Sequence, residues 1–190
     1  MKIIETNIPE VKIIEHKLFG DTRGYFFEAW NLDQYRQHGM DCRWVQDNES
    51  KSRFGVLRGL HYQLAPYTQT KLVRVIDGAV LDVAVDIRKN SPTFGQHTAV
   101  VLSSENKRQL FVPRGFAHGF VVLSESVIFA YKCDNPYMPS HERGIAFNDP
   151  ALKIDWQLDL SEYILSEKDT RNPLLADAEV FDYEKQDYLQ

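Results

Sequence analysis

Residues 55–63 read Gly-Val-Leu-Arg-Gly-Leu-His-Tyr-Gln, a short apolar run that carries a permanent cation and an imidazole three residues apart. A strand that only fills a core has no use for Arg58, because an arginine cannot lose its charge. Histidine titrates near neutral pH and is the commonest proton-transfer side chain, which makes His61 a candidate base. A surface edge strand with an incidental arginine and histidine explains this stretch equally well when it is taken alone.

The spacing of Arg58 and His61 raises a geometric question. A regular strand would place them on opposite faces of a sheet, because successive side chains alternate. If both belong to one site, either a β-bulge at Gly59 turns one of them or one acts from a strand end. The sequence leaves both options open.

Short apolar runs bounded by turn residues recur along the chain at roughly the 8–12-residue spacing of an all-β sandwich or barrel. Strands are predicted at residues 11–16, 25–30, 55–63, 70–76, 79–87, 98–102, 109–112, 119–123 and 127–131. Residues 19–24 are predicted to form a loop. A strand that begins at Cys42 is predicted to give way to another loop at residues 46–48, for which a hydrogen-bonding ledge is the alternative. Short helices are predicted at residues 31–39, with Asn31 as N-cap, and from Pro173 onward.

The Asp-Gly pair at positions 77–78 separates two apolar runs and predicts a β-hairpin. In the register of a two-residue loop, Lys71 lies opposite Ala84 and is the diagonal neighbour of Asp82 on the same face. A lysine and an aspartate on a face otherwise made of valines predict a buried ion pair or a site. A surface ion pair at the end of the sheet is the alternative.

Composition limits the possible functions. The 190 residues are 43% hydrophobic, which suits one domain with a sizeable core, and no repeat or low-complexity segment marks a boundary. A net charge of −5 argues against a nucleic-acid binder, and no run approaches the roughly 20 apolar residues of a membrane span. Glu5 and Pro9-Glu10 interrupt the region where a signal peptide needs its apolar run, so we expect a cytoplasmic protein. Cys42 and Cys133 are expected to be free thiols.

Several motifs in this order resemble those of dTDP-4-dehydrorhamnose 3,5-epimerases, and together they extend over about residues 1–175. They are Phe19-Gly20-Asp21-x-Arg23-Gly24-x-Phe26, Val45–Asn48, Gly55–Gln63, Lys71–Arg74, Asp82–Arg88, Ser91–Gly95, Pro113-x-Gly115-Phe116-Ala117-His118-Gly119-Phe120 and Ser166–Asp169. Each motif is weak evidence by itself, whereas the ordered set is highly specific.

The resemblance implies an all-β cupin jelly roll, a double-stranded β-helix barrel with a few short helices, that works as a homodimer. We therefore expect a single domain over residues 1–190. Residues 1–50 would supply an N-terminal arm and strands that contribute to the dimer and the site. Residues 51–135 would form the core barrel, and residues 136–190 a C-terminal segment with short helices.

A metal site is not expected. Cupins often bind a metal through an HxH strand and a later histidine, but here Gln63 stands where the second histidine would be. His61 and His118 without a third nearby ligand are a poor site for zinc or iron. The sequence therefore favours a metal-free enzyme over a metal-dependent oxygenase.

The resemblance also implies a reaction that needs no metal or redox cofactor. The family substrate is dTDP-4-dehydro-6-deoxy-D-glucose, whose C4 ketone acidifies the hydrogens on C3 and C5. Inversion of both centres gives dTDP-4-dehydro-L-rhamnose, a precursor in dTDP-L-rhamnose biosynthesis for cell-surface polysaccharide. By resemblance, His61 is the base, oriented by Asp169, and Tyr131 is the acid on the opposite face. Lys71 would stabilise the enolate.

Further positions match substrate-binding residues of the family. They are Arg23, Phe26, Glu28, Gln46, Asp47, Asn48, Arg58, Lys71, Asp82, His118, Tyr137, Glu142 and Lys168. The two arginines are forked cations suited to a pyrophosphate, and Phe26 and Tyr137 offer a stacking surface for the base.

Two alternatives stay open on the sequence. A single-centre epimerase or a ketoisomerase acting on a related dTDP-4-keto sugar would carry overlapping motifs. A sugar- or nucleotide-binding module that has lost catalysis is the other. The intact set of His61, Lys71, Tyr131 and Asp169 argues against the binding module, because a binder needs no opposed acid and base.

Overall fold

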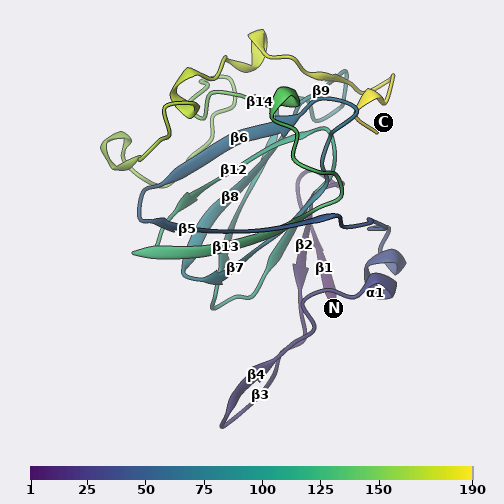
Figure 1. Ribbon diagram of the computed structural model, residues 1–190, viewed down its shortest axis with the longest axis vertical. Coiled ribbons are helices and arrows are strands. Elements are labelled where there is room, and N and C mark those ends of the chain that lie inside the picture. Colours follow the sequence, from purple (N-terminus) through teal and green to yellow (C-terminus); the bar gives the residue numbers. More distant parts are fainter. Residues whose placement is uncertain (190) are drawn as a thin grey trace.

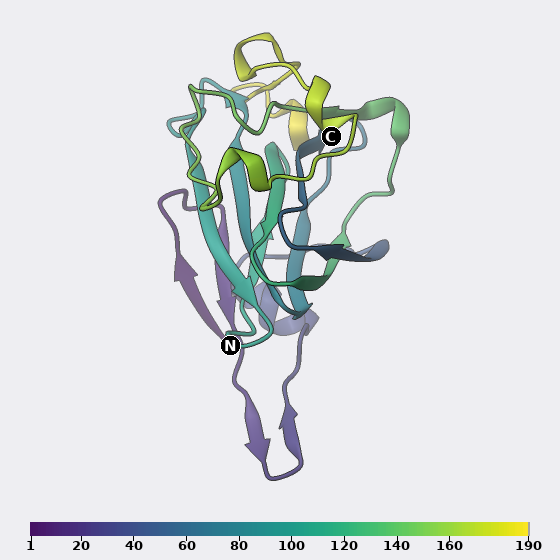
Figure 2. The same ribbon diagram turned by 90° about the vertical axis from the view of Figure 1, so that its left-hand side faces the viewer.

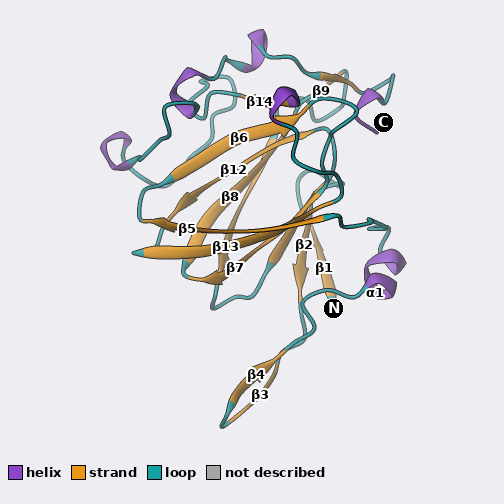
Figure 3. Ribbon diagram, in the orientation of Figure 1, coloured by secondary structure: helices purple, strands orange, loops and turns teal. Residues whose placement is uncertain are grey.

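Two antiparallel β-sheets lie face to face in the computed structural model, which describes residues 1–189 (Figures 1 and 3). The first sheet has the strand order β1 (Lys2–Glu5), β2 (Lys12–Glu15), β11 (Gln109–Val112), β7 (Lys71–Asp77), β13 (Ser126–Cys133) and β5 (Gln46–Arg53). The second sheet has the order β10 (His97–Ser103), β8 (Ala79–Asp86), β12 (Phe116–Val122), β6 (Leu57–Gln63) and β14 (Glu142–Gly144). The predicted all-β jelly roll with a few short helices is confirmed.

Short elements make up much of the rest. β3 (Phe19–Asp21) and β4 (Gly24–Phe26) form a hairpin, and β9 (Arg88–Lys89) pairs in parallel with β15 (Phe181–Asp182). The helix α1 spans Leu32–Gln37, and the 3-10 turns η1 to η5 span Pro139–His141, Leu160–Glu162, Asp169–Arg171, Leu175–Asp177 and Asp187–Leu189. Within residues 1–189, no helix has the length and apolar character needed to cross a membrane.

The predicted helix at residues 31–39 is confirmed, and its N-cap is Asn31, whose Oδ1 accepts a hydrogen bond from Gln34 N at 3.1 Å. The short helix expected from Pro173 is present as the 3-10 turn η4, but its predicted start is wrong. Leu174 still has an extended backbone, so η4 begins only at Leu175. The predicted loop at residues 19–24 is also wrong in part, because it contains β3 and the start of β4. The strand predicted at residues 25–30 ends at Phe26.

The chain reverses at positions 77–78 as expected, but the predicted hairpin is wrong. β7 belongs to the six-stranded sheet and β8 to the five-stranded sheet, so the chain crosses between sheets at Gly78. Gly78 has a φ of +85°, and a Cβ there would lie 2.1 Å from Ser126 O, so this turn requires glycine. An Asp-Gly pair encodes a reversal of chain direction, but the burial of each strand decides which strands it pairs with. The apolar β8 is buried almost throughout, between β10 and β12.

Residues 46–48, predicted to be a loop, are the start of β5. This strand pairs with β13 along its whole length, from Gln46 opposite Cys133 to Arg53 opposite Ser126. Its residues are polar on both faces, so the apolar alternation that normally reveals a strand is absent. The strand predicted to begin at Cys42 begins four residues later.

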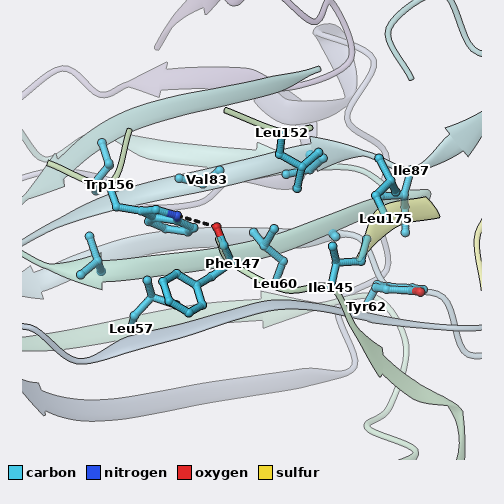
Figure 4. Packing of buried hydrophobic residues seen from close by; sticks show 14 of the residues in the cluster. Leu57, Leu60, Tyr62, Val83, Ile87, Ile145, Phe147, Leu152, Trp156 and Leu175 are labelled. Carbon is cyan, nitrogen blue, oxygen red and sulfur yellow. Dashed lines mark hydrogen bonds between the residues drawn. The ribbon is translucent and has the colours of Figure 1, made fainter. Parts of the chain in front are cut away.

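Apolar side chains fill one layer between the sheets and a second layer outside the five-stranded sheet. Between the sheets, Phe120 and Phe129 stack with their ring centroids 4.2 Å apart. In the outer layer, the chain beyond β14 covers the sheet, and Trp156 Nε1 donates to Phe147 O at 2.9 Å (Figure 4). Members of this layer include Leu57, Leu60, Tyr62, Val83, Ile87, Ile145, Leu152 and Leu175. The packing fixes the C-terminal segment, which carries Asp169, against the sheet that carries His61.

The β3–β4 hairpin projects away from both sheets (Figures 1 and 2). Its apolar side chains are exposed, with Phe19 at 54%, Tyr25 at 58% and Phe26 at 69%. Within this chain, the hairpin therefore buries little of its apolar surface.

Candidate active site

A β-bulge in β6 brings Arg58 and His61 to one cavity. In the pairing with β12, the two residues between them face the single residue Gly119. Gly59 has a φ of +135°, and a Cβ on it would lie 2.5 Å from Gly119 Cα, so the close approach of the strands depends on glycine. Of the two options that the sequence left open, the bulge is confirmed.

His61 forms a pair with a carboxylate 108 residues further along the chain. Its Nε2 lies 2.5 Å from Oδ1 of Asp169, which is only 4% exposed. Ser166 Oγ donates to Asp169 Oδ2 at 2.9 Å. Burial alone would raise the pKa of Asp169, but the hydrogen bonds from His61 and Ser166 hold that pKa below its usual range. The ionised carboxylate occupies Nε2, so Nδ1 is the ring nitrogen that can accept a proton from a substrate.

Lys71 and Tyr131 line the same cavity from the six-stranded sheet. Lys71 pairs with Cys133, and Tyr131 lies two residues before Cys133 on β13, so Lys71 and Tyr131 are diagonal neighbours on one face. Burial lowers the pKa of Lys71 and raises the pKa of Tyr131. A phenol that keeps its proton and an ammonium therefore lie across the cavity from the imidazole.

The cavity between the sheets has a volume of about 470 Å³. Eight of the predicted site residues line it, namely Arg58, His61, Lys71, His118, Tyr131, Glu142, Lys168 and Asp169. An adjoining cavity of about 320 Å³ shares His61, Lys71, Tyr131 and Glu142 and adds the predicted residues Gln46, Asn48 and Tyr137. The two cavities adjoin at these shared residues and are treated as one candidate site.

Asp82 lies beneath His118. His118 Nε2 is 2.9 Å and 3.0 Å from the two carboxylate oxygens of Asp82, and both side chains are buried. The expectation that Asp82 neighbours Lys71 along one sheet is wrong, because Asp82 is on β8 and Lys71 on β7. The Asp82 charge nevertheless acts on Lys71 from the opposite sheet, where it partly offsets the lowering of the lysine pKa by burial. Since Asp82 is fully buried, a surface ion pair is excluded.

A chain of polar contacts links the C-terminal segment to β5 at the edge of the site. Lys168 Nζ forms an ion pair with Glu142 Oε1, and Tyr137 Oη donates to Glu142 Oε2 at 2.6 Å. Tyr137 N donates to Gln46 Oε1 at 2.8 Å, and Gln46 Nε2 donates to Asn48 Oδ1 at 3.0 Å. Burial alone would raise the pKa of Glu142, but its bonds to Lys168 and Tyr137 lower it. The carboxylate therefore stays charged beside His61.

Four predicted site residues lie elsewhere in this chain. Asp47 points to the outer face of β5, where its carboxylate accepts from Lys132 Nζ at 2.7 Å. Arg23 and Phe26 lie in the projecting hairpin, and the side chain of Arg23 contacts Asp21. Glu28 follows the hairpin and accepts from the side-chain amide of Gln34 at 3.0 Å. None of the four lines the two cavities.

Two serines support the site and were missed from the sequence. Ser166 binds Asp169, and the spacing Ser166-x-x-Asp169, typical of a local turn, was the available signal. Ser52 Oγ accepts from Arg58 Nε and Nη2 at 3.2 Å each and holds the guanidinium toward the cavity. No local pattern in the polar β5 distinguishes Ser52.

Gln63 has a structural role. Its Nε2 donates to Tyr67 O at 2.6 Å and Pro136 O at 3.1 Å, and its Oε1 accepts from Met138 N at 2.6 Å. These bonds fasten the loop that carries Tyr137. Across residues 1–189, no three His, Cys, Asp or Glu side chains gather closely enough to hold a metal ion.

Comparisons with known proteins identify the family to which the chain is similar. The family model for dTDP-4-dehydrorhamnose 3,5-epimerase matches residues 5–177. The dTDP-4-dehydrorhamnose 3,5-epimerase of Salmonella typhimurium is 54% identical over 180 residues, covering 94% of this chain and 97% of the relative. The structure of a Legionella pneumophila dTDP-6-deoxy-D-glucose-3,5-epimerase in complex with dTDP-4-keto-L-rhamnose is 52% identical, with a TM-score of 0.92 over 96% of this chain and 98% of that one. A 3'-monoepimerase from Streptomyces bikiniensis in complex with dTDP-quinovose is 33% identical, with a TM-score of 0.89 over 95% and 93% of the two chains.

About half of the residues are identical to those of the Salmonella and Legionella enzymes over nearly the whole chain, and the fold is the same as in the solved structures. The protein is therefore an isomerase. Within that class, the chain belongs to the dTDP-4-dehydrorhamnose 3,5-epimerase family, as its ordered motifs predicted.

Proposed function

We propose that the protein inverts both C3 and C5 of dTDP-4-dehydro-6-deoxy-D-glucose to give dTDP-4-dehydro-L-rhamnose, for dTDP-L-rhamnose and cell-surface polysaccharide. One observation carries the proposal. The His61–Asp169 pair on one side of the cavity faces Tyr131 and Lys71 on the other. We place the reaction in the cytoplasm, where a reducing environment suits the free thiols of Cys42 and Cys133.

Each inversion is a proton removal followed by a proton return. Nδ1 of His61 takes the proton from C3 or C5, and the electrons of the broken C–H bond move into the C4 carbonyl. The resulting enolate oxygen is stabilised by the Lys71 ammonium. The hydroxyl of Tyr131 then protonates the same carbon from the opposite face, and the ketone re-forms. Exchange with solvent restores the neutral imidazole and the phenol.

The dTDP group is assigned to the polar side chains around this centre. Arg58, held by Ser52, grips the pyrophosphate, and Tyr137 stacks on the thymine. Gln46, Asn48, His118, Glu142 and Lys168 bind the remaining polar groups, with Asp82 supporting His118.

The site residues of the N-terminal arm are assigned a role in a homodimer. The exposed hairpin with Phe19, Tyr25 and Phe26 needs apolar cover, which a second copy of the chain supplies. In that arrangement, Arg23, Phe26 and Glu28 enter the partner's site. The dimer has a mass of about 44 kDa, twice the 22.0 kDa of one chain.

Incubation with the 4-keto sugar nucleotide in deuterated water tests the reaction. We expect deuterium at both C3 and C5 together with the L-rhamno product, measured by NMR. Label and inversion at one carbon only would identify a single-centre epimerase, and a shifted ketone would identify a ketoisomerase. Absence of both label and turnover would identify a binding module. Each of these three outcomes contradicts the proposal.

A further inference from the structure

Two segments far apart in sequence meet beside the His61–Asp169 pair. Gly144 in β14 lies directly opposite His61 in the strand pairing, and Asn172 follows the η3 turn that begins with Asp169. A Cβ on Gly144 would lie 2.5 Å from Asn172 Oδ1, 2.6 Å from its Cγ and 2.6 Å from its Nδ2. The flat amide of Asn172 therefore rests on the bare Cα of Gly144.

Gly144 is required for space and not for its backbone conformation. It lies in a regular antiparallel pairing, and its φ is outside the left-handed region. A Cβ cannot stay within 3 Å of three heavy atoms, so any larger residue at position 144 must displace Asn172. The Nδ2 atom of Asn172 is buried and has no hydrogen-bond partner among residues 1–189. The Nδ2 end of the Asn172 amide therefore contributes to the structure by packing on Gly144 and not by a hydrogen bond.

The chain on either side of this contact is firmly held. Ala146 N donates to Pro173 O at 2.8 Å, and Leu175 N donates to Asp149 Oδ2 at 2.7 Å. β14 is itself paired with β6. A short connected path therefore runs from His61 through β14 and residues 172–175 to the η3 turn. Because these bonds hold the backbone after Asn172, a displacement of the Asn172 backbone is passed to the turn that carries Asp169.

We infer that the contact of Asn172 with Gly144 sets the position of Asp169 against His61, which makes Asn172 a positioning residue. Its kinetic consequence rests on the proposed epimerisation. Asn172 is not among the residues that line either cavity, so it acts through Asp169 and not on the substrate. A hydrogen bond of 2.5 Å weakens when one partner retreats by a few tenths of an ångström.

Gly144→Ala tests the contact by adding one methyl group. We expect kcat to fall about tenfold or more while KM changes less than about twofold. Misplacement near 1 Å costs up to about 10²-fold, whereas Arg58 and Tyr137, which are assigned to the dTDP group, lie outside the η3 turn. Asn172→Ala removes the three atoms that the methyl would meet and alone should lower kcat a few-fold. In the double variant, kcat should exceed that of Gly144→Ala. Asn148→Ala, which removes an exposed amide from the same region, is the control with wild-type values.

Proton NMR gives a second readout that needs no substrate. The deshielded signal of the His61–Asp169 hydrogen bond, assigned by its loss in His61→Ala, should weaken in Gly144→Ala and recover in the double variant. If wild-type protein shows this signal but no turnover, the proposed function fails and the inference is still tested.

The inference is overturned if Gly144→Ala keeps the wild-type signal and kcat. It is also overturned if Gly144→Ala lowers kcat by the same factor in the wild-type background and in the Asn172→Ala background. Should Gly144→Ala fail to fold, Asn172→Ala decides by itself, and an unchanged kcat and signal there would refute the positioning role.

Discussion

At the residue scale, burial shifts the two titratable groups on the six-stranded side of the site in opposite directions. It favours the neutral form of each, so it lowers the pKa of Lys71 and raises that of Tyr131. Asp169 is also buried but remains charged, because His61 and Ser166 donate to it. The site therefore combines a phenol that keeps its proton with an ammonium that loses its proton at a lower pH than an exposed lysine.

The alkaline limb of the pH profile should report Lys71. Lysine and tyrosine ordinarily have pKa values of about 10.4 and about 10, and burial moves the pKa of Lys71 down and that of Tyr131 up. Stabilisation of the enolate by the Lys71 ammonium is present below the lowered lysine pKa and is lost as pH rises through it. Exchange of substrate protons and inversion should therefore fall together. Tyr131→Phe should leave the alkaline limb of exchange unchanged, and a displaced limb in that variant would assign it to the tyrosine.

The roles of His61 and Tyr131 should separate when exchange and inversion are measured together. His61→Ala should lower both by about 10²- to 10⁴-fold, since the base starts each inversion. Tyr131→Phe should lower inversion by a similar factor while exchange persists, because His61 can return a solvent proton to the same face. NMR in deuterated water measures both rates, and titration with dTDP checks that binding is retained. Equal loss of exchange in the two variants would show that acid and base are not opposed.

At the element scale, local signals in the sequence predicted strands better than they predicted strand partners. Apolar runs identified β6, β11 and β13, and Asn31 identified α1. The spacing of Arg58 and His61 left a bulge at Gly59 and a position at a strand end both open, and only the structure decided for the bulge. β5 was missed because its polar residues show no apolar face. The partners of β7 and β8 depend on burial across the whole molecule, which a turn sequence does not encode.

In the candidate site, too, the identities of the residues were predicted better than their spatial arrangement. The resemblance named the residues that meet in the cavities, but it did not show that Lys71 and Asp82 approach from different sheets. Asp47 illustrates the opposite error. Its neighbours Gln46 and Asn48 line a cavity, while strand alternation turns Asp47 outward to Lys132. Only once residues 46–48 are recognised as a strand does the motif divide into two faces.

At the scale of the whole molecule, two observations are not explained by one chain alone. The β3–β4 hairpin exposes apolar side chains away from both sheets, and Arg23, Phe26 and Glu28 lie outside the cavities of their own chain. Exchange of the arm between two copies would account for both observations.

Complementation between an inactive variant and an impaired one should show whether the arm serves the partner's site. His61→Ala removes the base, and Arg23→Glu should weaken kcat/KM by about tenfold to a hundredfold, since a hydrogen bond to a charged group contributes about 1.5–3 kcal/mol. If arms are exchanged, a mixed dimer has one site with both changes and one with neither. Co-refolding equal amounts makes about half of the dimers mixed, so about a quarter of the sites should be intact.

The control for this experiment pairs His61→Ala with Lys71→Ala, whose changes lie in the same barrel. No mixed dimer of that pair contains an intact site, so activity should not recover. Recovery with Arg23→Glu but not with Lys71→Ala supports exchange, because only a residue from the other chain can complete the site. If the first mixture stays at the activity of its parents while mass spectrometry of the intact dimers shows mixed dimers, the arm serves its own chain. An active monomer at assay concentration would exclude exchange altogether.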